Sequence, residues 1–288
     1  MKKIKVYLQS FRLRTLPLSV SGILLGTSAA QTDISIKIFI FNLLTAVLLQ
    51  ILANLANELG DLLHGTDTQQ QNRKAYALQE GKISIFEMKM LIGIFCILST
   101  LSGLTLLFVS LGNIWNFKGL IFILLGGFSI VAALKYTLGK RAYGYHYGGD
   151  LSVFVFFGLI SVNGTFFLQT AECSMFAFWL SIAMGLLCVG VLNLNNIRDF
   201  DNDLLFKKYT VATLLGKKKA TIYQAILLFS ATIILILNGL WISLIALPVF
   251  SWHIFVLQKG KNLDTQMPLL SLSILFLSIL CGIELLFC

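Results

Sequence analysis

Nine long apolar blocks constrain the fold of this chain more than any other feature of its sequence. They lie at about 16–31, 38–57, 90–111, 118–137, 151–169, 175–196, 219–239, 241–257 and 267–287. A helix that crosses the hydrocarbon of a bilayer needs roughly 20 mostly apolar residues, and an open backbone in lipid would leave its polar groups unpaired. The sequence therefore predicts an all-α, polytopic membrane protein with nine transmembrane helices, forming a single transmembrane domain over residues 1–288.

The composition supports this class and excludes others. Charged residues make up 12% of the chain, whereas soluble domains carry about a quarter. A soluble enzyme, a disordered chain and a coiled coil are therefore excluded. The five cysteines form no Cys-x-x-Cys pair and lie mostly within apolar blocks. We interpret them as packing residues rather than as a disulfide framework or a zinc site.

The basic residues predict the orientation of the chain in the membrane. Of the 22 Lys and Arg residues, all but Lys37 and Lys118 fall on one side of the nine predicted spans. Cytoplasmic loops carry such an excess of positive charge. We therefore expect a multi-pass protein of the inner (cytoplasmic) membrane with a cytoplasmic N-terminus. The net charge of +9 is then a consequence of topology, and no nucleic-acid partner is expected.

Two acidic segments follow the second and the sixth predicted span on that same side. The first contains Asn57 and Asp61, and the second contains Asn195, Asp199 and Asp203, each residue four positions after the one before it. On a helix this spacing stacks side chains on one face. Solvated helix ends would explain a single Asp, but two matched segments on one side favour a binding site.

Carboxylates that are stacked in this way, near lipid and at the C-terminal ends of helices, are disfavoured unless a cation is present. Oxygen-rich clusters without Cys ligands suit Mg²⁺, which binds one or two carboxylates together with substrate phosphates. The sequence thus predicts that each segment holds Mg²⁺ and that a diphosphate bridges the two. The predicted metal ligands are Asn57, Glu58, Asp61, Asp67, Asp199 and Asp203.

Other polar side chains on the same side are candidates for binding the diphosphate. They are Arg73, Lys140, Arg141, Arg198 and Lys208, together with the amides of Asn57, Asn195 and Asn196. Tyr136 and Lys140 lie one helical turn apart. A π face beside a phosphate-binding lysine would stabilise a developing carbocation.

These motifs resemble those of a known family. Residues 57–61, 65–67 and 195–199 with Asp203 are similar to the paired Asp motifs of the UbiA superfamily of intramembrane prenyltransferases. The segments 14–17, 136–141, 156–158, 164–170 and 210–216 resemble its MenA branch, the 1,4-dihydroxy-2-naphthoate polyprenyltransferases. Two positions depart from the pattern: Glu58 replaces the usual Asp, and Lys207 stands where Gly is expected.

The resemblance implies a cavity among the nine helices that opens toward the cytoplasm. A polyprenyl diphosphate would bind there through Mg²⁺, with Asp61, Asp199, Tyr136 and Lys140 as catalytic residues. The acceptor would be 1,4-dihydroxy-2-naphthoate, prenylated with loss of CO₂ to give demethylmenaquinone, and Arg14 would face its carboxylate. Three alternatives remain open: another aromatic acceptor such as 4-hydroxybenzoate, a cation-coupled transporter and a quinone-binding subunit.

Overall fold

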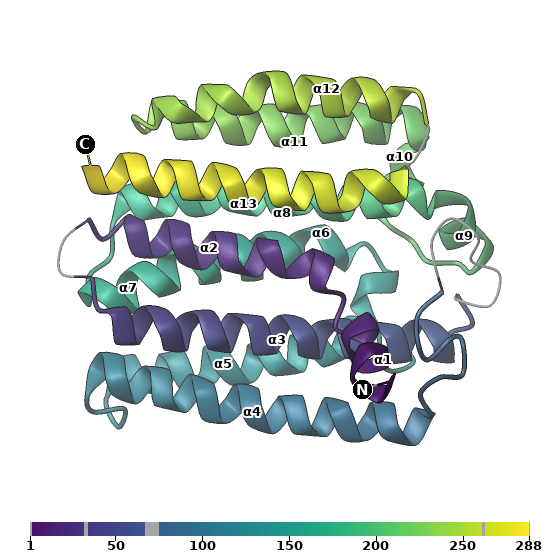
Figure 1. The fold of residues 1–288 in the computed structure, drawn as a ribbon, viewed down its shortest axis with the longest axis horizontal. Helices are drawn as coiled ribbons and strands as arrows, with labels where there is room; N and C mark the ends of the chain where they lie inside the picture. Colours follow the sequence, from purple (N-terminus) through teal and green to yellow (C-terminus); the bar gives the residue numbers. More distant parts are fainter. Residues whose placement is uncertain (1, 32–33, 67–74, 261–262, 288) are drawn as a thin grey trace.

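The structure is a computed structural model, and it describes residues 2–31, 34–66, 75–260 and 263–287. Over these ranges the chain is helical, and it contains one isolated β-bridge but no strand. The predicted all-α class is therefore confirmed. The long helices lie side by side along one direction (Figure 1). Helix α9 lies at one end of this bundle, and the C-terminus lies at the other.

The described residues form seventeen helical elements. They are α1 (Lys2–Ser10), η1 (Leu13–Thr15), α2 (Leu16–Ser28), α3 (Ile36–Leu63), α4 (Ile85–Leu111), α5 (Phe117–Lys135), η2 (Tyr143–Tyr145), α6 (Gly148–Val153), η3 (Phe154–Asn163), α7 (Gly164–Thr170), α8 (Met175–Arg198), α9 (Phe200–Leu205), α10 (Val211–Leu215), α11 (Lys217–Leu237), η4 (Trp241–Ile245), α12 (Ala246–Gln258) and α13 (Leu263–Phe287).

Each of the nine predicted blocks forms helix. Eight helical runs in the described chain are long and apolar enough to cross a membrane. The remaining block forms α2, which has 13 residues and begins with Pro17 in its first turn. The predicted number of nine is therefore close to what the structure shows. The difference arises because α2 is shorter than its apolar block.

Polar residues just outside the apolar blocks set the starts of several helices. Ser84 and Glu87 form a capping box before α4, and the side chain of Asn116 accepts a hydrogen bond from the backbone N–H of Gly119 before α5. Ser35 and Ser174 cap α3 and α8 in the same way. These side chains satisfy N–H groups that the first turn of a helix leaves without partners.

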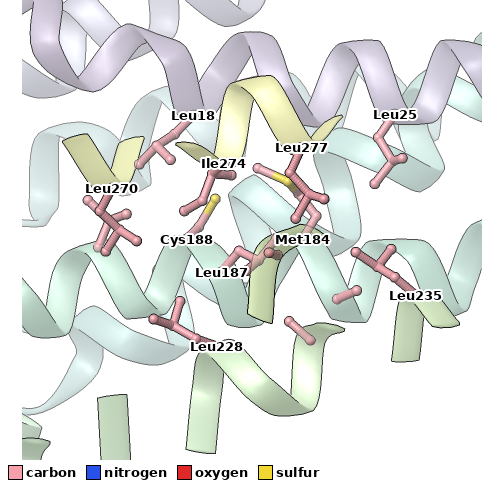
Figure 2. Close-up of a cluster of buried hydrophobic side chains, with 14 of the residues drawn as sticks. Leu18, Leu25, Met184, Leu187, Cys188, Leu228, Leu235, Leu270, Ile274 and Leu277 are labelled. Atoms are coloured by element: carbon pink, nitrogen blue, oxygen red, sulfur yellow. The ribbon is translucent and has the colours of Figure 1, made fainter. Parts of the chain in front are cut away.

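The main core joins α2, α8, α11 and α13. Figure 2 shows side chains from these helices that pack together, including Leu18, Met184, Leu228 and Ile274. A second apolar cluster joins α3 to α4 and includes Leu55 and Met88. The two clusters flank the part of the bundle in which the candidate site lies.

The fifth predicted span contains an irregularity that its sequence did not predict. Residues Phe154–Asn163 form the π-helix η3 within the continuous helical run Gly148–Thr170. Gly158 of η3 lies directly against α8, since a Cβ atom added to it would lie 2.6 Å from the Cα atom of Gly185. A π-helix is rare and often marks a functional site. Several η3 side chains line the cavity described next.

A cavity of about 1040 Å³ extends along the bundle. Its lining residues include Asp61 and Lys208 near one end and Lys118 and Cys173 near the other. Between these ends the walls are largely leucine, isoleucine and phenylalanine side chains from α4, α5 and η3. The fold therefore provides one long apolar cavity with a charged end.

Candidate active site

The charged end of the large cavity adjoins a small polar cavity of about 30 Å³. Its lining is made of Arg12, Asp61, Thr66, Tyr76, Asn195, Arg198, Asp199, Asn202, Asp203 and Lys208. Four of these residues, Arg12, Asp61, Asn195 and Lys208, also line the large cavity. The two cavities therefore meet where the two acidic segments lie.

The ends of two helices position the acidic segments. Helix α3 continues to Leu63, so Asn57 and Asp61 lie one turn apart on it and both line the large cavity. Helix α8 ends at Arg198, Asp199 follows as its C-cap, and Asp203 lies in the short helix α9. Asp199 and Asp203 are 7% and 2% exposed. Both segments thus reach one small cavity, as the sequence predicts.

A hydrogen bond ties the two segments to each other. The side-chain Nδ2 of Asn202 in α9 donates to the carbonyl oxygen of Thr66 at 2.9 Å. The hydroxyl of Thr66 donates to the carbonyl oxygen of Asp61 at 2.8 Å. The end of α3 and the short helix α9 are thereby joined through Thr66.

Lys208 lies between the carboxylates of the two segments. Its Nζ is 3.8 Å from Oδ1 of Asp61 and 3.9 Å from Oδ1 of Asp203. Burial disfavours the charged form of this amine, but the two carboxylates outweigh that effect and raise the pKa of Lys208 well above its ordinary value. A permanent cation therefore faces both acidic segments, as expected for a residue that contacts a diphosphate.

Tyr145 is a member of the site that the sequence did not single out. Its hydroxyl donates to Oδ1 of Asp61 at 2.7 Å, and its ring lies 5.3 Å from the Nζ of Lys208. The backbone N–H of Tyr209 donates to the carbonyl oxygen of Tyr145 at 3.0 Å, which brings Lys208 beside the ring. No motif or spacing in the sequence distinguishes Tyr145 from the other tyrosines among the eight in the chain.

Arg198 is directed at other protein groups. Its Nε and Nη2 donate to the two carboxylate oxygens of Asp199 at 2.8 and 2.7 Å, and Nη1 donates to Oδ1 of Asp264 at 3.0 Å. Nη2 also donates to the side chain of Asn195 at 2.8 Å. Arg198 therefore orients the second acidic segment in this structure, in addition to its predicted place beside the diphosphate.

Arg14 is not placed where the sequence predicts it. Its Nη1 donates to the same oxygen of Asp264 at 3.0 Å, and its Nη2 donates to the hydroxyl of Tyr76 at 2.9 Å. Arg14 lines neither cavity, whereas Arg12 lines both. One residue, Leu13, separates the two arginines, and Arg12 has a left-handed backbone between α1 and η1.

Glu58, Lys140 and Arg141 also lie away from the two cavities. Glu58 is fully buried, and its Oε1 accepts a hydrogen bond from the backbone N–H of Leu78 at 2.8 Å. It follows Asn57 on α3, so the helix turns it toward a different neighbour. Lys140 and Arg141 are exposed in the turn after α5. The structure thus does not place Lys140 beside Tyr136 in the cavity.

Tyr136 and Asn196 do line the large cavity. The ring of Tyr136 packs edge-on against Tyr143, with centroids 5.4 Å apart. Next to it, the hydroxyl of Thr137 lies 3.2 Å from Oδ1 of Asn57. Gly60 permits this approach, since a Cβ there would lie 2.5 Å from the Thr137 side chain. Asp67 and Arg73 fall outside the described residues.

The chemistry of the site fits Mg²⁺. Oδ2 of Asp203 is buried and has no hydrogen-bond partner within the described ranges. Burial, with the nearby charges of Asp199 and Asp61, raises the pKa of Asp203 to about 7, although Lys208 opposes the shift. Carboxylate and amide oxygens are the ligands that Mg²⁺ prefers. Among the described residues, no three His, Cys, Asp or Glu side chains come together as a complete metal site.

Comparison with known proteins identifies the family of the chain. The model of the UbiA prenyltransferase family matches residues 18–280. The chain belongs to the UbiA prenyltransferase family. The predicted resemblance to this family is therefore confirmed. Membership in an enzyme family also favours a prenyltransferase over the transporter and the quinone-binding subunit.

Two relatives of this UbiA-family chain share a name. It is 39% identical over 257 residues to the 1,4-dihydroxy-2-naphthoate octaprenyltransferase of Escherichia coli (strain K12), covering 86% of this chain and 83% of that protein. It is 33% identical over 303 residues to the Haemophilus influenzae protein of that name, covering 99% of this chain and 97% of that protein.

Solved UbiA structures share the fold. A UbiA homolog from Archaeoglobus fulgidus bound to DMAPP and Mg²⁺ superimposes with a TM-score of 0.70 at 16% identity, covering 98% of this chain and 99% of that one. The same homolog bound to GPP and Mg²⁺ gives a TM-score of 0.70 at 15% identity, again covering 98% of this chain and 99% of that one. At such identities the likeness establishes the arrangement of helices.

Proposed function

We propose that this protein is a Mg²⁺-dependent polyprenyltransferase of menaquinone biosynthesis. It transfers a polyprenyl group from polyprenyl diphosphate to 1,4-dihydroxy-2-naphthoate, releases diphosphate and CO₂, and gives the hydroquinone form of demethylmenaquinone. The observation that carries the proposal is the joining of two unlike cavities. A long apolar cavity suits a polyprenyl tail, and it meets a small cavity of carboxylate, amide and basic side chains that suits a diphosphate with its metal.

The names of the relatives support the choice of acceptor. The protein matches naphthoate octaprenyltransferases over most of its length. The solved UbiA homologs with DMAPP or GPP and Mg²⁺ support a prenyl diphosphate and a metal as the first substrate and its cofactor. We extend both assignments to this chain.

Each polar residue of the site has a proposed task. Asp61, Asp199 and Asp203, with the amide oxygens of Asn57 and Asn195, would hold the metal, and Asp67 remains a proposed ligand. Mg²⁺, when bound, neutralises the diphosphate and so assists its departure. Lys208 donates to the outer phosphate oxygens, as we propose for Arg73 as well. Arg198 holds Asp199 in the orientation that faces them.

The apolar cavity has two tasks in the reaction. It binds the polyprenyl tail by burying apolar surface, and it keeps water from the allylic cation that forms as the diphosphate leaves. The face of Tyr136 lies on its wall, where a π system stabilises positive charge. The acceptor ring then attacks the cation, and its carboxylate leaves as CO₂.

We further propose that the acidic end of the bundle faces the cytoplasm and that the protein resides in the inner membrane. The distribution of Lys and Arg along the chain supports this orientation. Both substrates would then reach the site from the cytoplasmic side or from the bilayer. Labelling of single introduced cysteines in intact cells would test the orientation.

The purified protein tests the proposed function directly. It would be assayed with all-trans polyprenyl diphosphate, Mg²⁺ and either 1,4-dihydroxy-2-naphthoate or 4-hydroxybenzoate. We expect one CO₂ released per prenyl group transferred to the naphthoate and little turnover of the benzoate. Preferred use of the benzoate, with its carboxylate retained in the product, would contradict the proposal.

A further inference from the structure

We propose that the aromatic acceptor binds against a polar patch on the wall between α2 and α3 and that Arg12 contacts its carboxylate. The patch consists of Thr15, Ser19, Gln50 and Asn54. All four residues and Arg12 line the large cavity. This inference rests on the proposed function, because it assigns a subsite to the acceptor of that reaction.

The patch is a connected set of hydrogen bonds inside the bundle. Gln50 Nε2 donates to the hydroxyl of Thr15 at 3.1 Å and to Oδ1 of Asn54 at 3.3 Å, and Ser19 donates to Oε1 of Gln50 at 3.4 Å. Asn54 Nδ2 donates to the hydroxyl of Thr15 at 3.0 Å. Ser19, Gln50 and Asn54 are 5%, 8% and 3% exposed. The side chains are therefore fixed in direction and face a largely apolar space.

A polyprenyl tail is a hydrocarbon and cannot form hydrogen bonds with the polar patch. Burying amide and hydroxyl groups against hydrocarbon costs free energy unless they find partners. The tail can instead pack against the apolar walls of the cavity, which include Leu104, Leu107, Ile121 and Phe122. The patch therefore suits a second occupant of the same cavity, one that carries polar groups on a flat apolar body.

The direction of the hydrogen bonds indicates the chemistry of that occupant. Both N–H groups of the Gln50 amide are already donated within the patch. Its Oε1 accepts one bond, from Ser19, and Oδ1 of Asn54 accepts one, from Gln50. An amide oxygen has two lone pairs, so each retains acceptor capacity toward the cavity. Phenolic hydroxyl groups are donors that match it.

The position of the patch fits an acceptor beside the reacting carbon. Asn54, Asn57 and Asp61 succeed one another on α3 and all line the cavity. Asn54 precedes Asp61 by seven residues, which corresponds to about 10 Å along the helix axis. A naphthalene ring on the patch would therefore lie next to the diphosphate site, with Tyr136 on the wall of the same cavity.

Arg12 supplies the charge that the acceptor carboxylate requires. It lies where the two cavities meet, and its guanidinium stands 3.9 Å above the centre of the Tyr76 ring. Its backbone adopts φ 50° and ψ 57°, a left-handed conformation that non-glycine residues seldom take. The hydroxyl of Thr15, a member of the patch, donates to the carbonyl oxygen of Arg12 at 2.9 Å. The patch and the arginine are thus one structural unit.

The first test replaces Gln50 by an apolar residue of similar shape. In Gln50→Met we expect the KM for the naphthoate to rise about tenfold, which corresponds to a loss of about 1.4 kcal/mol of binding free energy, because the hydrogen bond to the acceptor is lost. The KM for polyprenyl diphosphate and the Kd of an unreactive polyprenyl thiodiphosphate with Mg²⁺ should stay within about twofold.

Gln224→Met is the matched control. Gln224 is a fully buried glutamine on α11 that accepts a hydrogen bond from Asn193 at 2.8 Å and lines neither cavity. It therefore reports the general effect of removing a buried amide. An equal rise in the naphthoate KM in both variants would overturn the assignment of the patch, and so would a rise in the diphosphate KM equal to that in the naphthoate KM for Gln50→Met.

A second test addresses Arg12. We expect Arg12→Gln to weaken inhibition by 1-hydroxy-2-naphthoate about tenfold and to leave inhibition by 1,4-dihydroxynaphthalene, which lacks the carboxylate, nearly unchanged. Equal losses for both inhibitors, or a loss confined to the diphosphate, would overturn the role of Arg12. If the wild-type protein does not prenylate the naphthoate, the proposed function itself fails. If it does, and Gln50→Met retains the normal naphthoate KM, the subsite alone fails.

Discussion

Oδ1 of Asp264 accepts a hydrogen bond from Nη1 of Arg198 at 3.0 Å. The same oxygen accepts one from Arg14 at 3.0 Å, so a single carboxylate at the start of α13 joins the beginning of the first span to the end of α8. Arg198 in turn holds both oxygens of Asp199. The orientation of the second acidic segment thus depends on a residue far from it in the sequence.

This arrangement predicts that Asp264 acts on the metal site through Arg198. Removing a residue that orients a metal ligand typically costs 10- to 100-fold in metal affinity or activity. We expect Asp264→Ala to raise the Mg²⁺ concentration for half-maximal activity about tenfold. Asp264→Asn keeps an acceptor oxygen and should recover part of this loss. Mg²⁺-dependent binding of the thiodiphosphate gives a second measurement that does not depend on turnover.

The acidic segments give the second prediction. Asp61→Asn and Asp199→Asn should each lower kcat by orders of magnitude while the protein remains folded, because each removes an anionic oxygen from the metal site. A chelator should abolish wild-type activity, and Mg²⁺ should restore it. Asp201→Asn is the control, since Asp201 lies in the second acidic segment, between Asp199 and Asp203, but is exposed and paired with Lys217. Near-normal Mg²⁺-dependent turnover in both Asp61→Asn and Asp199→Asn would falsify the two-segment site.

Lys208 and Lys140 provide the third prediction. Lys208 faces Asp61 and Asp203, whereas Lys140 is exposed and lines neither cavity. We expect Lys208→Ala to raise the KM for polyprenyl diphosphate more than tenfold, since it removes a charge-assisted hydrogen bond worth roughly 1.5–3 kcal/mol. Lys140→Ala should change this KM less than twofold. The opposite ranking would mean that the turn after α5 moves into the cavity when substrate binds.

Tyr136 gives the fourth prediction. A cation–π contact of about 0.5–2 kcal/mol exists only once the allylic cation forms. Tyr136→Ala should therefore lower kcat roughly 2- to 30-fold and affect either KM less, whereas Tyr136→Phe, which keeps the π face, should remain close to the wild type. Steady-state kinetics of the three proteins decide the matter. Equal losses in the Ala and Phe variants would assign the role to the hydroxyl instead.

The helical architecture and the pairing of the acidic segments were predictable from the sequence. Each apolar block is long enough to require a helix in lipid, and the four-residue spacing of Asn57 with Asp61 and of Asn195 with Asp199 places each pair on one helix face. These relationships are local along the chain. The meeting of the two segments was predicted only coarsely, because both follow a span on the same predicted side of the membrane, and the structure places Asp61, Asp199 and Asp203 around one small cavity.

Contacts between distant segments were not predictable in the same way. Asp264 meets Arg14 and Arg198 because α13 packs beside α2 and α8, and no spacing in the sequence reports this packing. Tyr145 reaches Asp61 because its backbone pairs with Tyr209. Conversely, Lys140 follows Tyr136 by four residues, but α5 ends at Lys135 and the chain turns, so helical spacing no longer applies there.

The close contact between η3 and α8 gives a prediction about stability. A Cβ atom added to Gly158 would lie 2.6 Å from the Cα of Gly185 and 2.6 Å from the carbonyl oxygen of Ser181. Both are backbone atoms, which cannot move aside as a flexible side chain can. Overpacking of this kind costs about 1–3 kcal/mol. We expect Gly158→Ala to lower the Tm of the purified protein by several degrees.

Gly93→Ala serves as the comparison for that measurement. Gly93 lies inside α4, and a Cβ added there meets nothing within 4 Å. Alanine favours helix over glycine by about 0.8–1 kcal/mol in water, so this variant should keep or slightly raise the Tm. The two substitutions add the same methyl group to a helix and differ in what surrounds it. A Tm that falls equally in both would show that the close approach of η3 to α8 does not limit the stability of the bundle.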